Sequence, residues 1–117
     1  MPHVAPFFQG IHLTVTGHVK PSPSLSAAGV HAAFSSFYAG EKLIKVLPLN
    51  ETPDVARHGS SHHGVTVGGF TVDKLSGRVA CVATIDNLLK GAATQAIQNM
   101  NIALGLGEYD GIPLDKA

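Results

Sequence analysis

Histidines are the residues in this chain best suited to metal chemistry. There are seven of them, and His58, His62 and His63 lie close together. On a helix, His58 and His62 would share a face, and imidazole is a common zinc ligand. However, Gly59-Ser60-Ser61 between them is typical of a loop, and no cysteine is near enough in sequence to complete a tetrahedral site. We therefore predict no metal site and favour an exposed polar loop. Substrate contact and a His-loop metal-binding module remain the alternatives.

The single cysteine, Cys81, is a nucleophile by type but not by setting. It lies in the middle of an apolar, β-branched run, whereas a reactive thiol needs partial exposure and an electropositive neighbourhood. A buried free cysteine usually behaves as a small hydrophobic residue. We predict no catalytic role for Cys81, and a lone cysteine also excludes an internal disulfide.

Polar residues also gather between 86 and 93, where an apolar run meets a helical pattern. Asp86 and Asn87 are suitable helix caps, and Lys90 and Gly91 follow in the first turn. Free N–H groups and the positive end of the helix dipole favour anions at such a position. Because glycine has no Cβ, a ligand could approach the backbone closely at Gly91. These residues fit an ordinary capped helix or an anion site, and the capped helix is the favoured interpretation.

Hydrophobic periodicity predicts the elements that position these residues. Alternating apolar residues indicate strands, and apolar residues at i, i+3, i+4 and i+7 indicate helices. Ser24 or Ser26 would cap the first helix. In chain order we predict an extended segment at 1–10, a strand at 11–19, a helix at 30–37, a strand at 43–47, a long loop at 48–64, an antiparallel hairpin of strands 65–72 and 79–85, a helix at 89–104 and a loosely ordered tail from 108.

The order β-α-β-β-β-α with one tight hairpin predicts an α+β fold. We expect a mostly antiparallel sheet with helices packed on one face. The last helix carries a stripe rich in alanine, which allows close approach to another element. Whether that helix packs on this sheet is left open by the sequence.

Composition narrows the functional classes. Eight Lys and Arg balance eight Asp and Glu, which argues against a nucleic-acid-binding face or a polybasic membrane contact. The apolar runs are shorter than the roughly 20 residues that span a bilayer, and the start of the chain has neither a signal-peptide nor a transit-peptide pattern. Charged residues make up only 14% of the 117 residues, against about 25% in typical domains. Part of the surface is therefore expected to be covered by another structure.

One long segment carries a family resemblance. Residues 85–101, Ile-Asp-Asn-Leu-Leu-Lys-Gly-Ala-Ala-Thr-Gln-Ala-Ile-Gln-Asn-Met-Asn, resemble the C-terminal signature of N-acetyl-γ-glutamyl-phosphate reductase. The segments 2–11, 41–46 and 77–79 are similar to the family as well, so the resemblance covers essentially the whole chain and roughly the last third of the enzyme. Residues 8–9, 67–70 and 107–113 favour the fungal mitochondrial form.

The resemblance implies a fold and a chemistry. The fold would be a glyceraldehyde-3-phosphate-dehydrogenase-like C-terminal domain, from an NADP-dependent oxidoreductase of arginine biosynthesis, a branch of amino-acid biosynthesis. In the family, a cysteine thiolate attacks the acyl phosphate, phosphate leaves, and NADPH delivers hydride to give the semialdehyde, with a histidine as acid and base. The motifs of that cysteine, that histidine and the Gly-rich nucleotide loop are absent from this sequence. We expect no catalytic residue, no cofactor for this chain alone, and no activity by itself.

The resemblance also implies a division of the chain and a set of contacts. Residues 1–86 would be part of the catalytic and dimerisation domain, 87–105 a C-terminal helix that packs on the nucleotide domain, and 106–117 a tail. It implies cofactor-binding roles for Asn87, Lys90 and Gly91, and substrate-binding roles for His3, Gln9 and Arg57. Many bacterial members carry arginine where Gln9 stands, which weakens a phosphate-binding role there.

The expected partners are the nucleotide-binding domain of the same enzyme and further copies in a homo-oligomer, with no nucleic acid and no membrane. Mitochondrial matrix is the expected location, and cytoplasm is the alternative. A methionine precedes the Pro-His segment in fungal members, so the chain could be a fragment of a longer protein. A non-catalytic dimerisation or association module is the alternative function.

Overall fold

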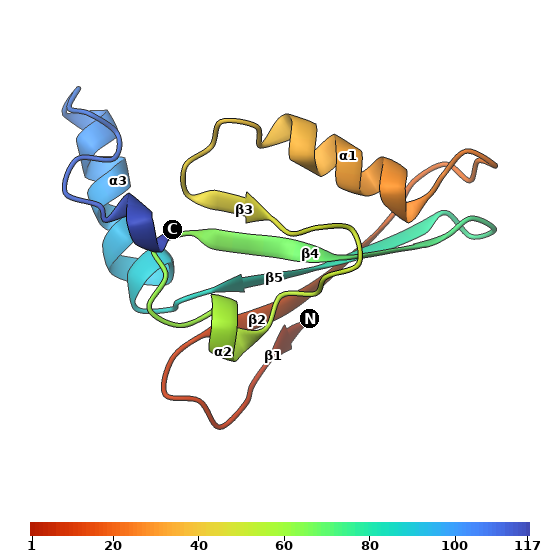
Figure 1. Cartoon of the computed structure of the whole chain (residues 1–117), viewed down its shortest axis with the longest axis horizontal. Helices are drawn as coiled ribbons and strands as arrows, with labels where there is room; N and C mark the ends of the chain where they lie inside the picture. Colours follow the sequence, from red (N-terminus) through yellow and green to blue (C-terminus); the bar gives the residue numbers. More distant parts are fainter.

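A twisted five-stranded sheet runs through the computed structural model, which describes residues 1–117 (Figure 1). The strand order is β1-β2-β5-β4-β3. Every neighbouring pair is antiparallel except β3 and β4, which are parallel, so the predicted mostly antiparallel sheet is confirmed. The strands are β1 (Pro2–His3), β2 (Ile11–His18), β3 (Ile44–Val46), β4 (Val65–Asp73) and β5 (Arg78–Ile85).

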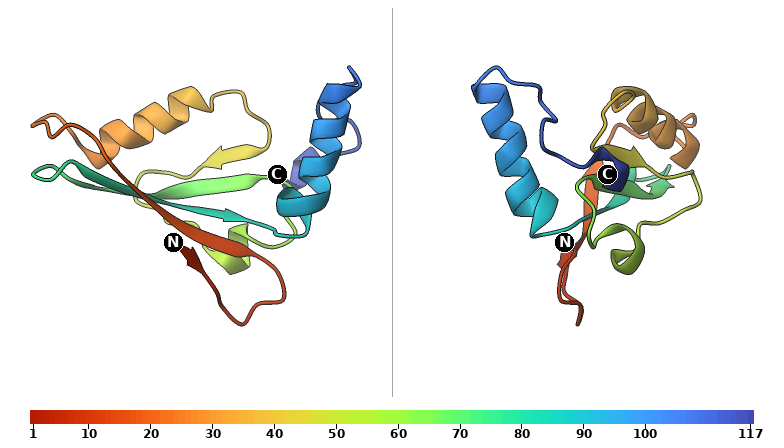
Figure 2. Two further views of the ribbon diagram at one scale, coloured as in Figure 1. Left: turned by 180° about the vertical axis from the view of Figure 1, so that it is seen from behind. Right: turned by 60° about the vertical axis from the view of Figure 1, so that its left-hand side comes forward.

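Helices lie on both sides of this sheet but only some of them pack on it. α1 contacts β4 and β3, and α2 contacts β5. Figure 2 shows α1 and α2 on one side of the strands and α3 on the other. The helical elements are α1 (Ala27–Phe37), α2 (Val55–His58), a π-helical turn η1 (Leu89–Ala93) that leads into α3 (Thr94–Ala103), and a short 3₁₀ turn η2 (Leu114–Lys116).

α1 forms and packs as its sequence predicts. The Ser26 hydroxyl accepts a hydrogen bond from the Gly29 amide at 3.1 Å, which satisfies one of the free donors at the start of the helix. On the inward side, the ring of Phe34 lies 5.0 Å from that of Phe70 on β4. The buried core is small and comprises Leu43, Leu47, Val67, Phe70 and Ile112.

The hairpin of β4 and β5 is also confirmed, and it contains a β-bulge. Gly68 pairs with Val82 and Thr71 with Ala80, so two residues of β4 oppose one of β5 between these pairs. Gly69 has a φ of 63°, a left-handed conformation that glycine adopts without steric cost.

Two local predictions were wrong, and a third was incomplete. The N-terminal segment is extended as predicted, and it also contributes a strand, because β1 pairs with β2 through Pro2 and His3. The long loop contains α2, a single turn whose first amides are capped by Asp54. The tail is ordered, because it folds back against α3 and the sheet, and Ile112 within it is only 7% exposed.

The fold is open for its mass. The accessible surface is 7098 Å², whereas a compact monomer of 12.1 kDa would expose about 6,000 Å². The radius of gyration is 15.5 Å, against about 13 Å for a compact domain of this length. None of the helices combines the length with the apolar composition that a membrane-spanning helix requires. The large accessible surface agrees with the low fraction of charged residues, because a large surface with few charged side chains must expose apolar ones.

Candidate functional site

The candidate site lies where β5 ends, at Asp86. Its side chain is completely buried, and its carboxylate accepts three backbone hydrogen bonds, from Ser61 at 2.7 Å, Leu88 at 2.8 Å and Leu89 at 3.1 Å. The predicted cap is therefore confirmed. It also joins the 59–63 loop to the start of the last helix, and it occupies amides that an anion would otherwise use.

Asn87 ties a third segment to the same point. Its Oδ1 accepts a hydrogen bond from the Gly10 amide at 2.7 Å. Gly10 has a φ of 116°, and a Cβ there would stand 2.7 Å from Cγ1 of Val55 and 2.8 Å from the carbonyl oxygen of Gly59. Only glycine fits this close approach. The side-chain oxygen of Asn87 thus positions the loop before β2, and its amide nitrogen makes no hydrogen bond.

Lys90 and Gly91 lie in the π-helical turn η1, a geometry that is rare and often found at functional sites. The ammonium of Lys90 donates to Oε1 of Gln98 at 2.6 Å. Partial burial lowers the pKa of Lys90, and the negative charge of Glu108 opposes that shift. The Gly91 amide donates to the carbonyl of Asp86 at 2.9 Å. Lys90 is thus the cation at the junction between the end of β5 and the start of the last helix, and Gln98 of α3 holds its ammonium.

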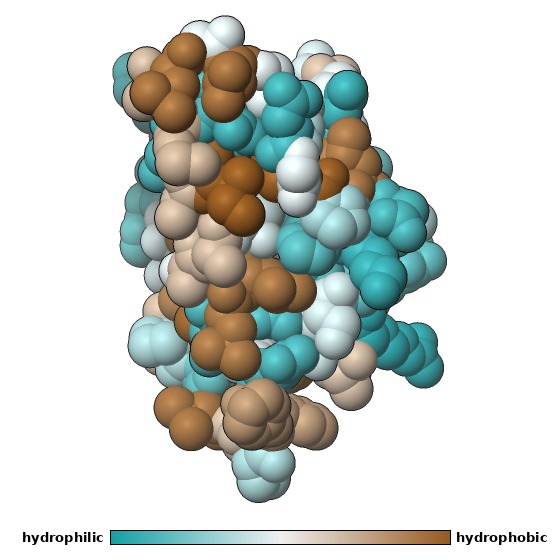
Figure 3. All heavy atoms as spheres, turned by 90° about the vertical axis from the view of Figure 1, so that its left-hand side faces the viewer, coloured by the Kyte–Doolittle hydropathy of each residue, from teal (hydrophilic) through white to brown (hydrophobic).

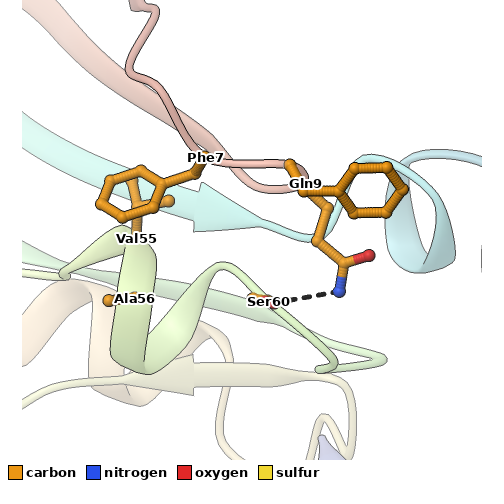
Figure 4. A pocket seen from close by; sticks show the side chains of 6 residues that line it. Phe7, Gln9, Val55, Ala56 and Ser60 are labelled. Carbon is orange, nitrogen blue, oxygen red and sulfur yellow. Dashed lines mark hydrogen bonds between the residues drawn. The ribbon is translucent and has the colours of Figure 1, made fainter.

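A shallow pocket opens beside the junction, between the segment before β2 and α2 (Figure 4). Nε2 of Gln9 donates to the Ser60 hydroxyl at 2.9 Å and to that of Ser61 at 3.3 Å. The cavity is about 370 Å³ and combines apolar walls with this polar pair. It is lined by Phe7, Phe8, Gln9, Val55, Ala56 and Ser60.

Arg57 and His3 occupy different places relative to this pocket. Arg57 lies on α2, next to the lining residue Ala56, and is exposed. Its backbone amide donates to Oδ1 of Asp54 and its backbone carbonyl meets Nε2 of His62, so the guanidinium is available to an acidic ligand. His3 lies on β1, where Nε2 is 2.8 Å from the Thr14 hydroxyl. The predicted substrate residues Gln9 and Arg57 thus lie near one pocket, whereas His3 is engaged on the sheet edge.

The three grouped histidines are engaged separately. Nδ1 of His58 accepts from the Asp54 amide at 2.9 Å, Nε2 of His62 lies 2.8 Å from the carbonyl of Arg57, and Nδ1 of His63 lies 2.7 Å from the Thr94 hydroxyl. No group of three or more His, Cys, Asp or Glu side chains is placed to hold a metal ion. Each imidazole therefore has a structural partner instead of a shared ion.

Cys81 lies on β5 in an apolar setting. It borders a shallow cavity with Val15, Val79 and Phe34 of α1. Burial raises the pKa of the thiol, which lowers the thiolate fraction and hence the nucleophilicity near neutral pH. In this setting the Cys81 thiol is a weak nucleophile.

The apolar stripe of α3 faces outward. Figure 3 shows a band of apolar side chains on the side of the molecule that α3 forms. Met100 is 53% exposed and Leu104 66%, and Ala92, Ala96 and Ala103 are exposed as well. The buried residues of α3 are polar, Thr94 and Asn101. This arrangement is the reverse of a helix that packs on its own core, and sequence periodicity alone could not have revealed which face turns inward.

Known proteins are similar to this chain in sequence and in fold. A family described as semialdehyde dehydrogenase, dimerisation domain, matches residues 1–87. Over 113 residues the chain is 52% identical to "Protein arg-6, mitochondrial" of Neurospora crassa. This match covers 97% of this chain and 12% of that protein. Over 112 residues it is 49% identical to the "N-acetyl-gamma-glutamyl-phosphate reductase" of Xanthomonas campestris, which covers 96% of this chain and 34% of that one. The resemblance read from the sequence is confirmed, for a chain that spans only part of its relatives.

A solved structure supports the fold. Aspartate semialdehyde dehydrogenase II from Vibrio cholerae superposes with a TM-score of 0.70 and 23% sequence identity, over 86% of this chain and 28% of that one. At this identity the likeness concerns the fold alone. It confirms the predicted α+β fold.

Proposed function

The chain belongs to the semialdehyde dehydrogenase dimerisation-domain family, and we propose that it is the dimerisation part of an NADPH-dependent reductase. The reaction would convert N-acetyl-γ-glutamyl phosphate to N-acetylglutamate semialdehyde in arginine biosynthesis. The observation that carries this proposal is the identity of about one half, over nearly the whole chain, to proteins named as that reductase. The nucleotide-binding domain would be supplied by the same polypeptide or by another one.

In this proposal the chain binds and orients, while another domain performs the covalent chemistry. Bound NADPH would supply the hydride. Lys90 and Asn87, together with the glycine at 91, would form one wall of the cofactor site. The residues fit a wall and not a complete site, because Asp86 already occupies amides at the helix start and Lys90 is held by Gln98.

The pocket beside the junction would receive the substrate. Arg57 offers a guanidinium with no side-chain partner to an acidic substrate, in the geometry that suits carboxylate and phosphate. Gln9 would hold the Ser60 loop in place and leave anion binding to Arg57, because its amide nitrogen already donates to two serine hydroxyls. His3 would act indirectly, by holding the edge of the sheet in place, because its ring is already hydrogen-bonded to the Thr14 hydroxyl.

A non-catalytic association module is the second candidate, and the outward apolar face of α3 favours it. A free monomer seldom leaves such a band uncovered, and exposed apolar patches of this kind mark interfaces. The two candidates share partners, namely a nucleotide-binding domain and a further copy of the chain. They differ in whether activity appears when those partners are present. The His-loop metal module has less support, because each of its histidines has its own partner.

The fungal relatives are named as mitochondrial proteins. These names support the proposal that the working enzyme is in the mitochondrial matrix, with the cytoplasm as the alternative. Expression of the corresponding full-length gene product with a fluorescent tag would distinguish these locations.

Turnover by the purified chain is the first test. The chain is incubated with NADPH and N-acetyl-γ-glutamyl phosphate, and loss of NADPH absorbance is followed. We expect no rate above the buffer control, because the chain contains no activated thiol. A steady rate that scales with chain concentration would overturn the assignment of catalysis to another domain. A parallel zinc titration should show no stoichiometric binding, and a tight one-to-one complex would favour the metal module.

A further inference from the structure

α3 has no direct support from the sheet. It packs on η1 and is hydrogen-bonded to the tail, whereas no strand makes an extensive contact with it, and Figure 2 shows it standing away from the strands. Its direct tie to the rest of the fold is at its base, where the Thr94 hydroxyl lies 2.7 Å from Nδ1 of His63. A helix held only at one end over a π-helical turn could pivot. Something else must fix its direction.

Asn101, near the far end of α3, provides a second attachment. It is 3% exposed, and its Nδ2 donates to the carbonyls of Glu108 at 3.2 Å and Asp110 at 2.9 Å. The backbone carbonyl of Asn101 accepts a hydrogen bond from the Leu106 amide at 2.9 Å. A carboxamide carries two N–H donors, so this residue type is matched to the two carbonyls it meets.

The same segment continues from α3 to the sheet side of the molecule. Nζ of Lys42 lies 5.1 Å from the centre of the Tyr109 ring, a cation–π distance. Further along, the carbonyl of Lys116 accepts from the His63 amide at 2.7 Å. Ile112, between these contacts, is buried. Residues 106–117 thus bridge the far end of α3 and the segments next to β3 and β4.

We infer that residues 106–117 form a clamp that sets the angle at which α3 leaves the sheet, with Asn101 as its positioning residue. The clamp turns the polar face of α3 inward and holds the apolar face outward. Only one part of this inference rests on the proposed function, namely that the outward apolar face of α3 meets a nucleotide-binding domain. The angle itself is a property of this chain alone.

The test measures that angle in the full chain. Spin labels are placed at two exposed positions, Lys74→Cys on the hairpin turn and Ala103→Cys on α3, in a Cys81→Ser background, and their distance distribution is recorded by pulsed electron resonance. The perturbing variant is Asn101→Asp, which keeps the shape but replaces the donor group with an anion that faces two carbonyls. The control is Asn99→Asp, which adds the same charge to the exposed side of the same helix.

The clamp predicts a single narrow distance for the unsubstituted background and for Asn99→Asp, and loss of that narrow distribution for Asn101→Asp. Hydrogen exchange in the same variant should show lost protection at the Leu106 and Ile112 amides with β4 and β5 unchanged. An unchanged distance in Asn101→Asp would overturn the clamp. Equal loss of protection in β4 and β5 would also overturn it, because Asn101 would then support the whole fold. No nucleotide-binding domain is present, so either failure leaves the proposed reductase role intact.

Discussion

Removal of the Asp86 carboxylate should loosen the junction on which the candidate site is built. Asp86→Ala leaves the amides of Ser61, Leu88 and Leu89 without their acceptor. Loss of a helix cap costs about 1 kcal/mol, and loss of a hydrogen bond to a charged group costs roughly 1.5–3 kcal/mol. With the cap and the Ser61 tie both removed, the free energy of unfolding should fall by about 3 kcal/mol.

Urea unfolding followed by circular dichroism measures this loss. Asp86→Asn is the informative companion, because one oxygen can still cap the helix while the amide nitrogen faces the Ser61 N–H. It should lose about 2 kcal/mol, mostly from the Ser61 tie. Asp115→Ala, an exposed carboxylate on η2, is the matched control and should stay within about 0.5 kcal/mol of the unsubstituted chain. If Asp86→Ala unfolds at the same urea concentration as this control, the junction does not depend on Asp86.

Three further outcomes follow from the same geometry. Met100→Glu on the outward face of α3 should change the stability of the chain by less than about 0.5 kcal/mol while preventing association with a nucleotide-binding fragment in sedimentation; retained association would place the contact elsewhere. Hydrogen bonds, first from the Ser76 hydroxyl, lower the pKa of Asp73 below its ordinary 3.8. Its contribution to stability is therefore present above that pH and lost as the pH falls through the folded-state pKa. Acid unfolding curves should show a weaker pH dependence for Asp73→Asn, and an identical dependence would contradict this. The Cys81 thiol, whose pKa is raised by burial, should react with a thiol reagent more slowly in the native chain than in urea; equal rates would mean that the site is open.

Local patterns were enough to predict the elements that are closed by nearby residues. Ser26 caps α1 as its position before an apolar helix suggests, and Asp86 caps the last helix for the same reason. The β4–β5 hairpin follows from two β-branched runs around a polar turn. In each case the residues that decide the structure lie within a few positions of one another.

Elements that depend on distant partners were missed. β1 is a strand because Pro2 and His3 pair with residues of β2. A strand of two residues is too short to show an alternation of apolar and polar residues. α2 is a single turn, too short for a periodic signal. Nothing local marks either as a paired strand or a helix, so the first was predicted only as an extended segment and the second as a loop.

The orientation of α3 could not be predicted for a related reason. Periodicity correctly separates an alanine-rich face from the face of Thr94 and Asn101, but an apolar face is assumed to turn inward. Here the polar face turns inward, because its carboxamide meets the carbonyls of the 106–117 segment. At the candidate site, Gln9 and Asn87 were predicted and do lie near one junction, whereas the structural ties of Asp86 and Gln9 to the 59–63 loop needed the tertiary structure.

The central claim is that this chain completes a reductase by supplying an association surface, while another domain supplies the chemistry. It is tested most directly by titrating the chain into a fixed amount of a nucleotide-binding fragment from a related reductase, with NADPH and N-acetyl-γ-glutamyl phosphate present. NADPH oxidation should rise with chain concentration and saturate, and Met100→Glu should abolish the rise. Oxidation by the chain without the fragment, or no rise at any chain concentration, would contradict it.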